Sequence, residues 1–170
     1  MLPPKLNEAL NIQMNNEFYS EYAYLSMAAY FHSNDLDGMA NFFHIQAKEE
    51  HFHAMKIFNF IINRGGKVEL KAIKAPKVDF SSPIEVFEAA LEHEQFVTKS
   101  INDVMDISIE ENDHAVNSFL KWYVDEQVEE EATANKNLGK IKLIGGKGEG
   151  LLMLDTELAK RVFTEPAASE

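Results

Sequence analysis

Apolar residues recur every three or four positions over four long stretches of the chain, which is the spacing of one face of an α-helix. The stripes predict helices over residues of about 5–33, 37–64, 83–111 and 113–143. Five prolines, at positions 3, 4, 76, 83 and 166, leave these stretches almost free of the strongest helix breaker. The sequence therefore predicts an all-α protein with four long helices.

Start and stop signals support these bounds. Ser82-Pro83-Ile84-Glu85 is a capping box with proline at the first helical position, so it predicts the start of the third helix. Arg64-Gly65-Gly66 places a cation in the last turn of the second helix and glycines after it. The polar residues 33–35 and 111–113 separate the helices within each pair.

The connections select the topology. Short links predict that the first and second helices are antiparallel, and likewise the third and fourth. Residues 65–81 form a connection of 17 residues, which spans roughly 55 Å when extended, against roughly 40 Å for a long helix. This connection can cross the whole bundle. We therefore expect a four-helix bundle with one long crossover, the connectivity of ferritin-like folds.

A fifth, short helix is predicted over residues 149–162, after the glycine-rich segment 145–150. Its apolar stripe comprises Leu151, Leu154, Leu158 and Val162. A helix this short is marginal in isolation, and with the four-helix core complete we expect it to dock on a neighbouring subunit. Residues 163–170 are expected to be a frayed tail, so that residues 1–170 form a single domain.

The amino-acid composition limits the kinds of partner that the protein is expected to bind. The 28 acidic residues exceed the 16 basic ones and give a formal charge of −12, which disfavours nucleic acids and anionic membranes and favours cations. The chain has no cysteine, which excludes disulfides and thiolate metal sites. No run of about 18 apolar residues and no apolar leader occurs, so no membrane association is expected and a cytoplasmic location is the default.

The candidate chemistry lies in residues that interrupt the apolar stripes. Glu17, Glu50, Glu94 and Gln127 occupy core-facing positions near the middle of their helices, where a carboxylate is rare unless it is paired or binds metal. Glu17 and Glu50 are 33 residues apart, as are Glu94 and Gln127. The second pair lies 77 residues after the first, so the two halves of the chain repeat one another. Each helix of an internally repeated bundle thus contributes one buried polar side chain.

Two further residues complete the repeat. His53 and Glu130 each follow the second member of their half by three positions, which places them on the same helix face. Four carboxylates buried together would repel one another, and metal dications would remove that cost. Carboxylates with one imidazole suit iron, manganese or zinc, and the pattern matches the di-iron carboxylate bundles. The sequence predicts two metal ions roughly 3.5–4 Å apart.

Four segments of the chain resemble the signature segments of the prokaryotic non-haem ferritins. They are Asn16-Glu17-Phe18-Tyr19, Glu49-Glu50-x-x-His53, His93-Glu94-Gln95-Phe96 and the run Trp122-Tyr123-Val124-Asp125-Glu126-Gln127-Val128-Glu129-Glu130-Glu131. The resemblance implies that Glu17, Glu50 and His53 bind one iron, with Glu50 bridging to a second. It also implies ferroxidase activity, in which Fe(II) is oxidised by dioxygen or hydrogen peroxide and stored as ferric mineral.

For the second iron, the resemblance implies Glu94 and Glu130 as ligands with Gln127 beside them, and Tyr24 as an adjacent electron donor. A third iron site is implied at Glu49, Glu126, Glu129 and Glu130. The family also implies a homo-oligomeric shell of twenty-four subunits, with the fifth helix lining fourfold pores, and no haem.

Several residues allow a purely structural interpretation. Gln127 could be a hydrogen-bonded core amide, because a neutral amide is a poor metal ligand. Tyr24 could simply pack with a satisfied hydroxyl. Glu126 and Glu129 belong to a charge run, and such runs are usually solvated; Glu131 is assigned to solvent on that ground.

Departures from related families limit the function. The second half has Gln127-Val128-Glu129-Glu130 in place of a second Glu-x-x-His, which argues against bacterioferritins and substrate-oxidising di-iron enzymes. In animal ferritins, an acidic pair lines the threefold channels through which iron enters. The corresponding positions here are Asn117 and Leu120, so iron entry by that route is not expected.

Two rival functions remain open from the sequence. One is a soluble di-iron peroxidase or oxidase of rubrerythrin type, without stored mineral, although the rubredoxin-type cysteines are missing. The other is a metal-free structural bundle, whose stability would not respond to chelators or added Fe(II).

Overall fold

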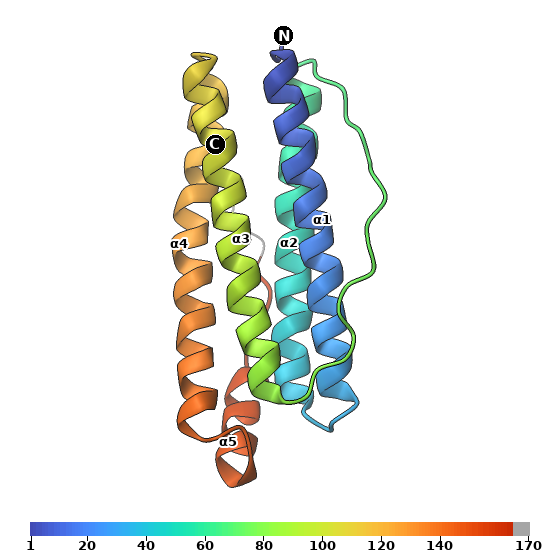
Figure 1. Ribbon diagram of the computed structural model, residues 1–170, viewed down its shortest axis with the longest axis vertical. Coiled ribbons are helices and arrows are strands. Elements are labelled where there is room, and N and C mark those ends of the chain that lie inside the picture. The colour runs from blue at the N-terminus through green and yellow to red at the C-terminus, as the bar shows by residue number, and fades with distance from the viewer. Residues whose placement is uncertain (165–170) are drawn as a thin grey trace.

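In the computed structural model, which describes residues 1–164, the four apolar stripes form the long helices of one bundle (Figure 1). The helices are α1 (Pro4–His32), α2 (Asp37–Asn63), α3 (Pro83–Glu110), α4 (His114–Leu143) and the short α5 (Gly148–Leu158). Each long helix begins and ends within one residue of its predicted bounds. The predicted all-α fold is confirmed: α1 and α2 are antiparallel, as are α3 and α4, and one long crossover joins the pairs (Figure 1).

Side-chain caps and left-handed turn residues fix the helix ends. Ser82 accepts a hydrogen bond at 3.2 Å from the backbone N–H three residues on, as the capping box predicts, and Asp113 does the same for α4 at 3.0 Å. The short turns each contain a non-glycine residue with positive φ, Asp35 at 57° and Asn112 at 55°. Aspartate and asparagine tolerate this conformation best. These two residues are 77 positions apart, so the internal repeat extends to the turns.

Three asparagines on one face of α1 hold the crossover in place. The side chains of Asn7, Asn11 and Asn15 accept hydrogen bonds from the backbone N–H groups of Lys67, Glu69 and Lys71, at 2.9, 2.7 and 2.9 Å. Their amide nitrogens donate back to crossover carbonyls at 2.8–3.2 Å. Four helical residues rise about 6 Å and two extended residues span about 6.6 Å, so the two periods match. These side-chain hydrogen bonds therefore satisfy an extended backbone that pairs with no strand in residues 1–164.

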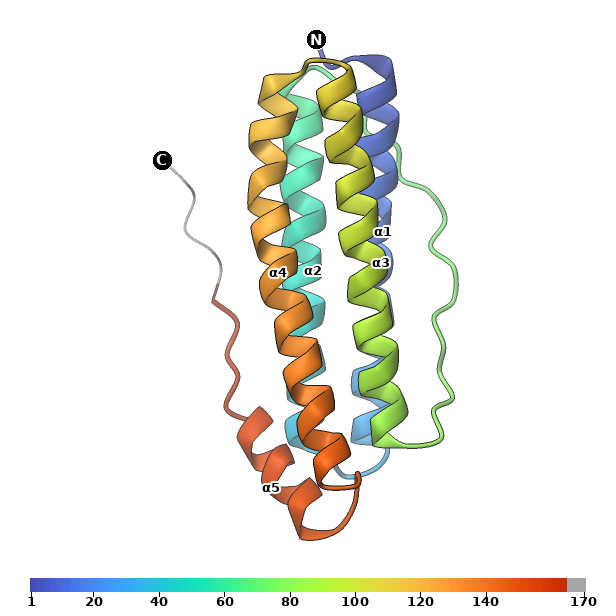
Figure 2. The same ribbon diagram turned by 60° about the vertical axis from the view of Figure 1, so that its left-hand side comes forward.

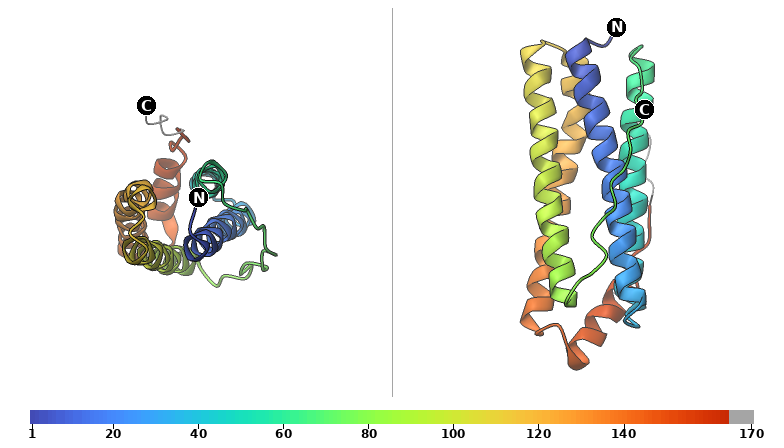
Figure 3. Two further views of the ribbon diagram at one scale, coloured as in Figure 1. Left: turned by 90° about the horizontal axis from the view of Figure 1, so that it is seen from above. Right: turned by 45° about the vertical axis from the view of Figure 1, so that its right-hand side comes forward.

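The fifth helix docks on its own chain, at the end of the bundle opposite the N-terminus (Figures 2 and 3). Leu154 and Leu158 are buried in the same apolar cluster as the start of α2. Asp155 Oδ1 accepts a hydrogen bond from Met39 N at 2.8 Å, which caps α2 where its own N-cap residue offers no side-chain acceptor. The approach is close: a Cβ on Gly38 would lie 1.8 Å from the backbone oxygen of Asp155.

Two expectations about this end of the chain are corrected. The fifth helix ends at Leu158 rather than at 162, because Asn41 on α2 hydrogen-bonds the carbonyls of Ala159 and Arg161 and draws the chain along α2. Docking on a neighbouring subunit is not needed to bury its Leu154 and Leu158 face. Of the predicted tail 163–170, residues 165–170 lie outside the described part of the chain.

The apolar core is divided into two clusters by a polar layer. One cluster fills the end of the bundle next to α5, and the other fills the end that contains the N-terminus. On each long helix the change from one cluster to the other coincides with buried polar residues. They are Glu17 and Ser20 on α1, Gln46, Glu50 and His53 on α2, Glu94 on α3, and Gln127 and Glu130 on α4. None of the helices in residues 1–164 is both long enough and apolar enough to cross a membrane.

Candidate metal centre

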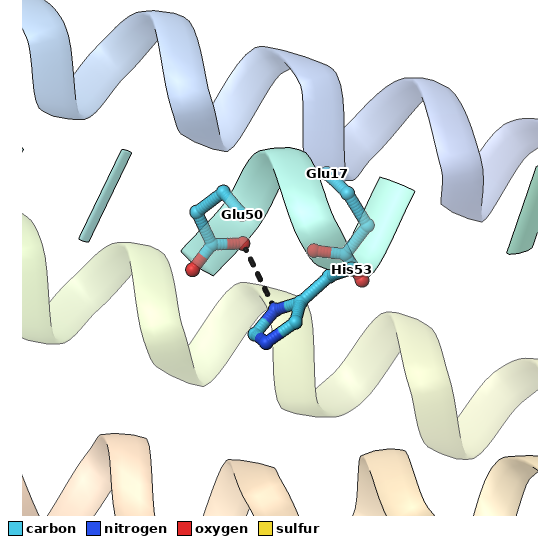
Figure 4. Close-up of side chains that lie close together, drawn as sticks. All are labelled: Glu17, Glu50 and His53. Carbon is cyan, nitrogen blue, oxygen red and sulfur yellow. Dashed lines mark ion pairs between the residues drawn. The ribbon is translucent and has the colours of Figure 1, made fainter. Parts of the chain in front are cut away.

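Glu17, Glu50 and His53 come together in the polar layer (Figure 4). One potential ligand atom from each lies within 4.8 Å of the other two, and His53 Nδ1 is 3.5 Å from Glu50 Oε2. Glu17 is contributed by α1, whereas the other two lie one turn apart on α2. All three side chains are buried, and the second carboxylate oxygen of Glu17 has no hydrogen-bond partner within residues 1–164. The three side chains predicted to bind the first iron thus lie close to one another.

Glu94 from α3 and Glu130 from α4 supply the opposite side of the layer. Both are buried, at 2% and 6% exposure, and the charges of both act on Glu50. Four carboxylates from four helices therefore share one dry region. In residues 1–164, no lysine or arginine pairs with any of the four.

Burial perturbs the acidity of the layer. Desolvation raises the pKa of Glu17 well above its usual value, and the charge of Glu50 raises it further. The pKa of Glu50 is likewise raised by burial, then by Glu94 and Glu130. Burial, followed by the charge of Glu130, raises the pKa of Glu94 to about 7. Without cations, the layer thus favours protonated carboxyls, and bound dications would favour the ionised form.

Two glutamines that sequence reasoning missed orient the acids. Gln13 Nε2 donates to Glu17 Oε1 at 2.8 Å, and Gln46 Nε2 donates to Glu130 Oε2 at 2.9 Å. Both are buried, and the side-chain oxygen of Gln46 accepts no hydrogen bond from the described part of the chain. Their spacing could have revealed them, since each lies four residues, or one helical turn, before Glu17 or Glu50 and the two are 33 positions apart.

Gln127 binds Glu94 through its amide nitrogen. Nε2 lies 3.0 Å from Glu94 Oε2 and 3.2 Å from Thr98 Oγ1, a geometry that fits the core-amide interpretation. Thr98 in turn donates to Glu131 Oε1 at 2.6 Å. The assignment of Glu131 to solvent was therefore wrong: it is half-buried and terminates a hydrogen-bond chain that begins at Glu94.

Two tyrosine hydroxyls lie beside the polar layer and hydrogen-bond to it. Tyr24 donates to Glu94 Oε1, so the predicted tyrosine does lie next to the centre. Burial, and then the charge of Glu94, raises the pKa of the Tyr24 phenol well above its usual value. Tyr123, which the sequence did not single out, donates at 2.8 Å to the backbone carbonyl of His53 and fixes that turn of α2.

The residues predicted for a third site are less closely gathered. Glu126 is half-buried, with its pKa raised by burial, and Glu129 is exposed. Glu49 forms an ion pair with Arg161 at 2.6 Å, and burial raises its pKa to about 7 although Arg161 opposes the shift. Among the described residues, the trio of Glu17, Glu50 and His53 is the one set of three or more acidic or histidine side chains whose ligand atoms lie within 4.8 Å of one another.

Comparison with known proteins agrees with this geometry. The profile of the ferritin-like domain family matches residues 7–144. The chain is 45% identical to the bacterial non-heme ferritin of Staphylococcus aureus strain MRSA252 over 165 residues, which is 97% of this chain and 99% of that one. The Staphylococcus saprophyticus protein of the same name is also 45% identical, with the same coverage of both chains.

Solved structures show the same relationship. An engineered closed form of the Archaeoglobus fulgidus ferritin superposes with a TM-score of 0.95 at 48% identity, covering 96% of this chain and all of the other. The open-pore ferritin of the same archaeon gives a TM-score of 0.94 at 47% identity, covering 95% of this chain and all of the other.

Proposed function

The chain belongs to the ferritin family, and we propose that it stores iron by oxidising Fe(II) at the buried carboxylate layer and depositing Fe(III) as mineral. Fe(II) is the substrate, and dioxygen or hydrogen peroxide is the oxidant. One observation carries this proposal: Glu17, Glu50, Glu94 and Glu130 converge from four helices in a dry layer where, in residues 1–164, no lysine or arginine pairs with them. Such a layer is costly unless cations enter it.

Charge balance gives the layer its selectivity for a metal pair. Two Fe(II) ions carry four positive charges, which match four ionised carboxylates. Glu17, Glu50 and His53 would hold the first ion, and Glu94 and Glu130 the second, with Glu50 between them. Each ion loses one electron, so the pair can reduce dioxygen to hydrogen peroxide with the uptake of two protons. The oxidised pair carries six charges against four acids, and hydroxide from water, formed with release of protons, would supply the balance as Fe(III) leaves for the mineral.

Surrounding residues hold the ligands in position. Gln13, Gln46 and Tyr24 donate hydrogen bonds to Glu17, Glu130 and Glu94, respectively. These donors leave Glu17 Oε2 and Glu130 Oε1 available for metal, whereas both oxygens of Glu94 accept a hydrogen bond and would bind metal through a remaining lone pair. We assign Gln127 to the same orienting role at Glu94, rather than to direct ligation. An electron-donating role for Tyr24 is part of the proposal and rests on its contact with Glu94.

Assembly is the other part of the proposal. We infer a homo-oligomeric shell of twenty-four subunits in the cytoplasm, following the resemblance to non-haem ferritins. The outward face of α5 supports further contacts, since Leu152 and Met153 are exposed on a helix whose opposite face is buried. The third iron site at Glu49, Glu126, Glu129 and Glu130 remains part of this proposal, as a station between the layer and the mineral.

Aerobic addition of excess Fe(II), followed by size-exclusion chromatography, tests this function. We expect soluble ferric mineral to co-elute with a particle of about 460 kDa, twenty-four copies of a 19.3 kDa chain. Glu17→Gln should abolish rapid oxidation, whereas Glu8→Gln, at an exposed position on the same helix, should not. Turnover that stops at two irons per chain would favour a rubrerythrin-type enzyme, and oxidation no faster than without protein would favour a structural bundle.

A further inference from the structure

The segment that follows α5, residues 159–164, runs from the end of the bundle back along its length (Figure 2). Asn41 on α2 anchors it, donating to the backbone oxygens of Ala159 at 3.3 Å and Arg161 at 3.0 Å. Phe163, further along, lines a groove together with His51 and Phe52 of α2. This C-terminal segment is therefore held against α2 by its backbone as well as by its side chains.

Within this segment, Arg161 places a permanent cation beside the candidate metal centre. Its Nη2 donates to Glu49 Oε2 at 2.6 Å, and its guanidinium lies 4.5 Å from the ring centre of Phe42. The two charged side chains are 23% and 21% exposed, respectively. A half-buried, charge-assisted pair of this kind is much less screened than a surface pair.

Glu49 lies at the edge of the carboxylate layer. It precedes Glu50 in the chain, and the charges of Glu130 and His53 act on it. It thus adjoins the buried acids while keeping some contact with solvent. A metal ion that moved from the layer toward solvent on this side would meet Glu49 already occupied by Arg161.

We propose that Arg161 is the resident counter-cation of Glu49 and that a metal ion must displace it to bind there, so that Arg161 controls metal occupancy next to the oxidation centre. This inference rests on the proposed function. It makes Arg161 a positioning residue that acts through Glu49. The step is a cation exchange, in which the guanidinium moves to solvent as the metal ion takes its place and no covalent bond changes.

Two features of the ion pair between Arg161 and Glu49 allow the guanidinium to be displaced. Among residues 1–164, the buried Arg161 Nη1 has no hydrogen-bond acceptor, so within this part of the chain the bound position leaves one donor unsatisfied. An unsatisfied buried donor is costly, and release of the guanidinium to water removes that cost. Because Asn41 binds only backbone carbonyls of the segment, the guanidinium can leave without detaching the chain.

Calorimetric titration with Zn(II), which binds without redox turnover, tests this proposal on the assembled protein. Arg161→Gln removes the charge and keeps a polar side chain, whereas Arg161→Lys keeps the charge. We expect Arg161→Gln to strengthen the binding step assigned to Glu49 by about tenfold. Arg161→Lys should resemble the parent protein, and the gain should vanish when Arg161→Gln is combined with Glu49→Gln.

The outcomes separate this inference from the function on which it rests. If Zn(II) fills the buried layer but Arg161→Gln leaves every binding step unchanged, the exchange at Glu49 is refuted while the metal centre stands. A gain that persists with Glu49→Gln, or that Arg161→Lys reproduces, also refutes it. If the parent protein binds no Zn(II) in the layer and Glu17→Gln changes nothing, the proposed function itself fails.

Discussion

Replacement of Glu94 by glutamine should stabilise the metal-free protein at pH 8 and should abolish the proposed ferroxidase activity. Burial and the charge of Glu130 raise the pKa of Glu94 from 4.5 to about 7. The folded protein therefore holds this proton more tightly than the unfolded chain does. Stability consequently falls as the pH rises from about 4.5 to about 7, the opposite of a carboxylate in a salt bridge.

The magnitude follows from this shift. Ionisation of Glu94 in the fold costs about 3 kcal/mol at pH 8, since each pKa unit corresponds to about 1.36 kcal/mol. Glutamine carries no charge, but it can accept only one of the hydrogen bonds that Tyr24 and Gln127 now donate to the two oxygens. That loss costs about 1 kcal/mol. The expected net gain is about 2 kcal/mol at pH 8 and about zero at pH 5, where Glu94 keeps its proton.

Denaturant unfolding of chelator-treated protein at pH 5 and pH 8 measures this effect. Glu92→Gln, at an exposed position two residues away on α3, is the matched control and should change the unfolding free energy by less than about 0.5 kcal/mol. A Glu94→Gln protein that is no more stable than its parent at pH 8 would refute the claim that this carboxyl is desolvated and uncompensated.

Three other changes probe the supporting structure. Asn11→Ala should lower the free energy of unfolding by about 1–2 kcal/mol, because the Glu69 N–H loses its acceptor. Hydrogen exchange of that amide should become faster, and unchanged protection would contradict the role of Asn11 in holding the crossover. Gly38→Ala should detach α5, because the new Cβ would overlap Asp155, and protease cleavage within α5 should rise; full resistance would contradict the close docking. Tyr24→Phe should slow Fe(II) oxidation severalfold in stopped-flow absorbance without changing the fold, and an unchanged rate would remove Tyr24 from the proposal.

The long helices were predictable because local start and stop signals at several of their ends agree with the apolar periodicity. Ser82 caps α3 as its capping box predicts, and the two polar turns fall at Asp35 and Asn112. The end of α5 was not predictable in this way. Its apolar stripe continues to Val162, but Asn41 on another helix pulls the chain out of the helix after Leu158. Tertiary hydrogen bonds of this kind leave no periodic signal in the sequence.

The centre was predictable where acids interrupt an apolar stripe. Glu17, Glu50 and His53 were identified from their helical spacing, and the structure brings them together. Partners from other helices were harder to predict, because a contact such as that between Gln46 and Glu130 depends on how α2 faces α4. Arg161 is the extreme case, since it reaches Glu49 only through the path of the chain after α5.

Anomalous diffraction at the iron edge, on crystals soaked anaerobically in Fe(II), is the most direct test of the central claim. The buried layer predicts two iron peaks per chain, roughly 3.5–4 Å apart, one beside Glu17 and His53 and the other beside Glu94 and Glu130. A layer without iron under these conditions, with the four carboxyls still buried, would show that protonation and not metal binding makes their burial tolerable.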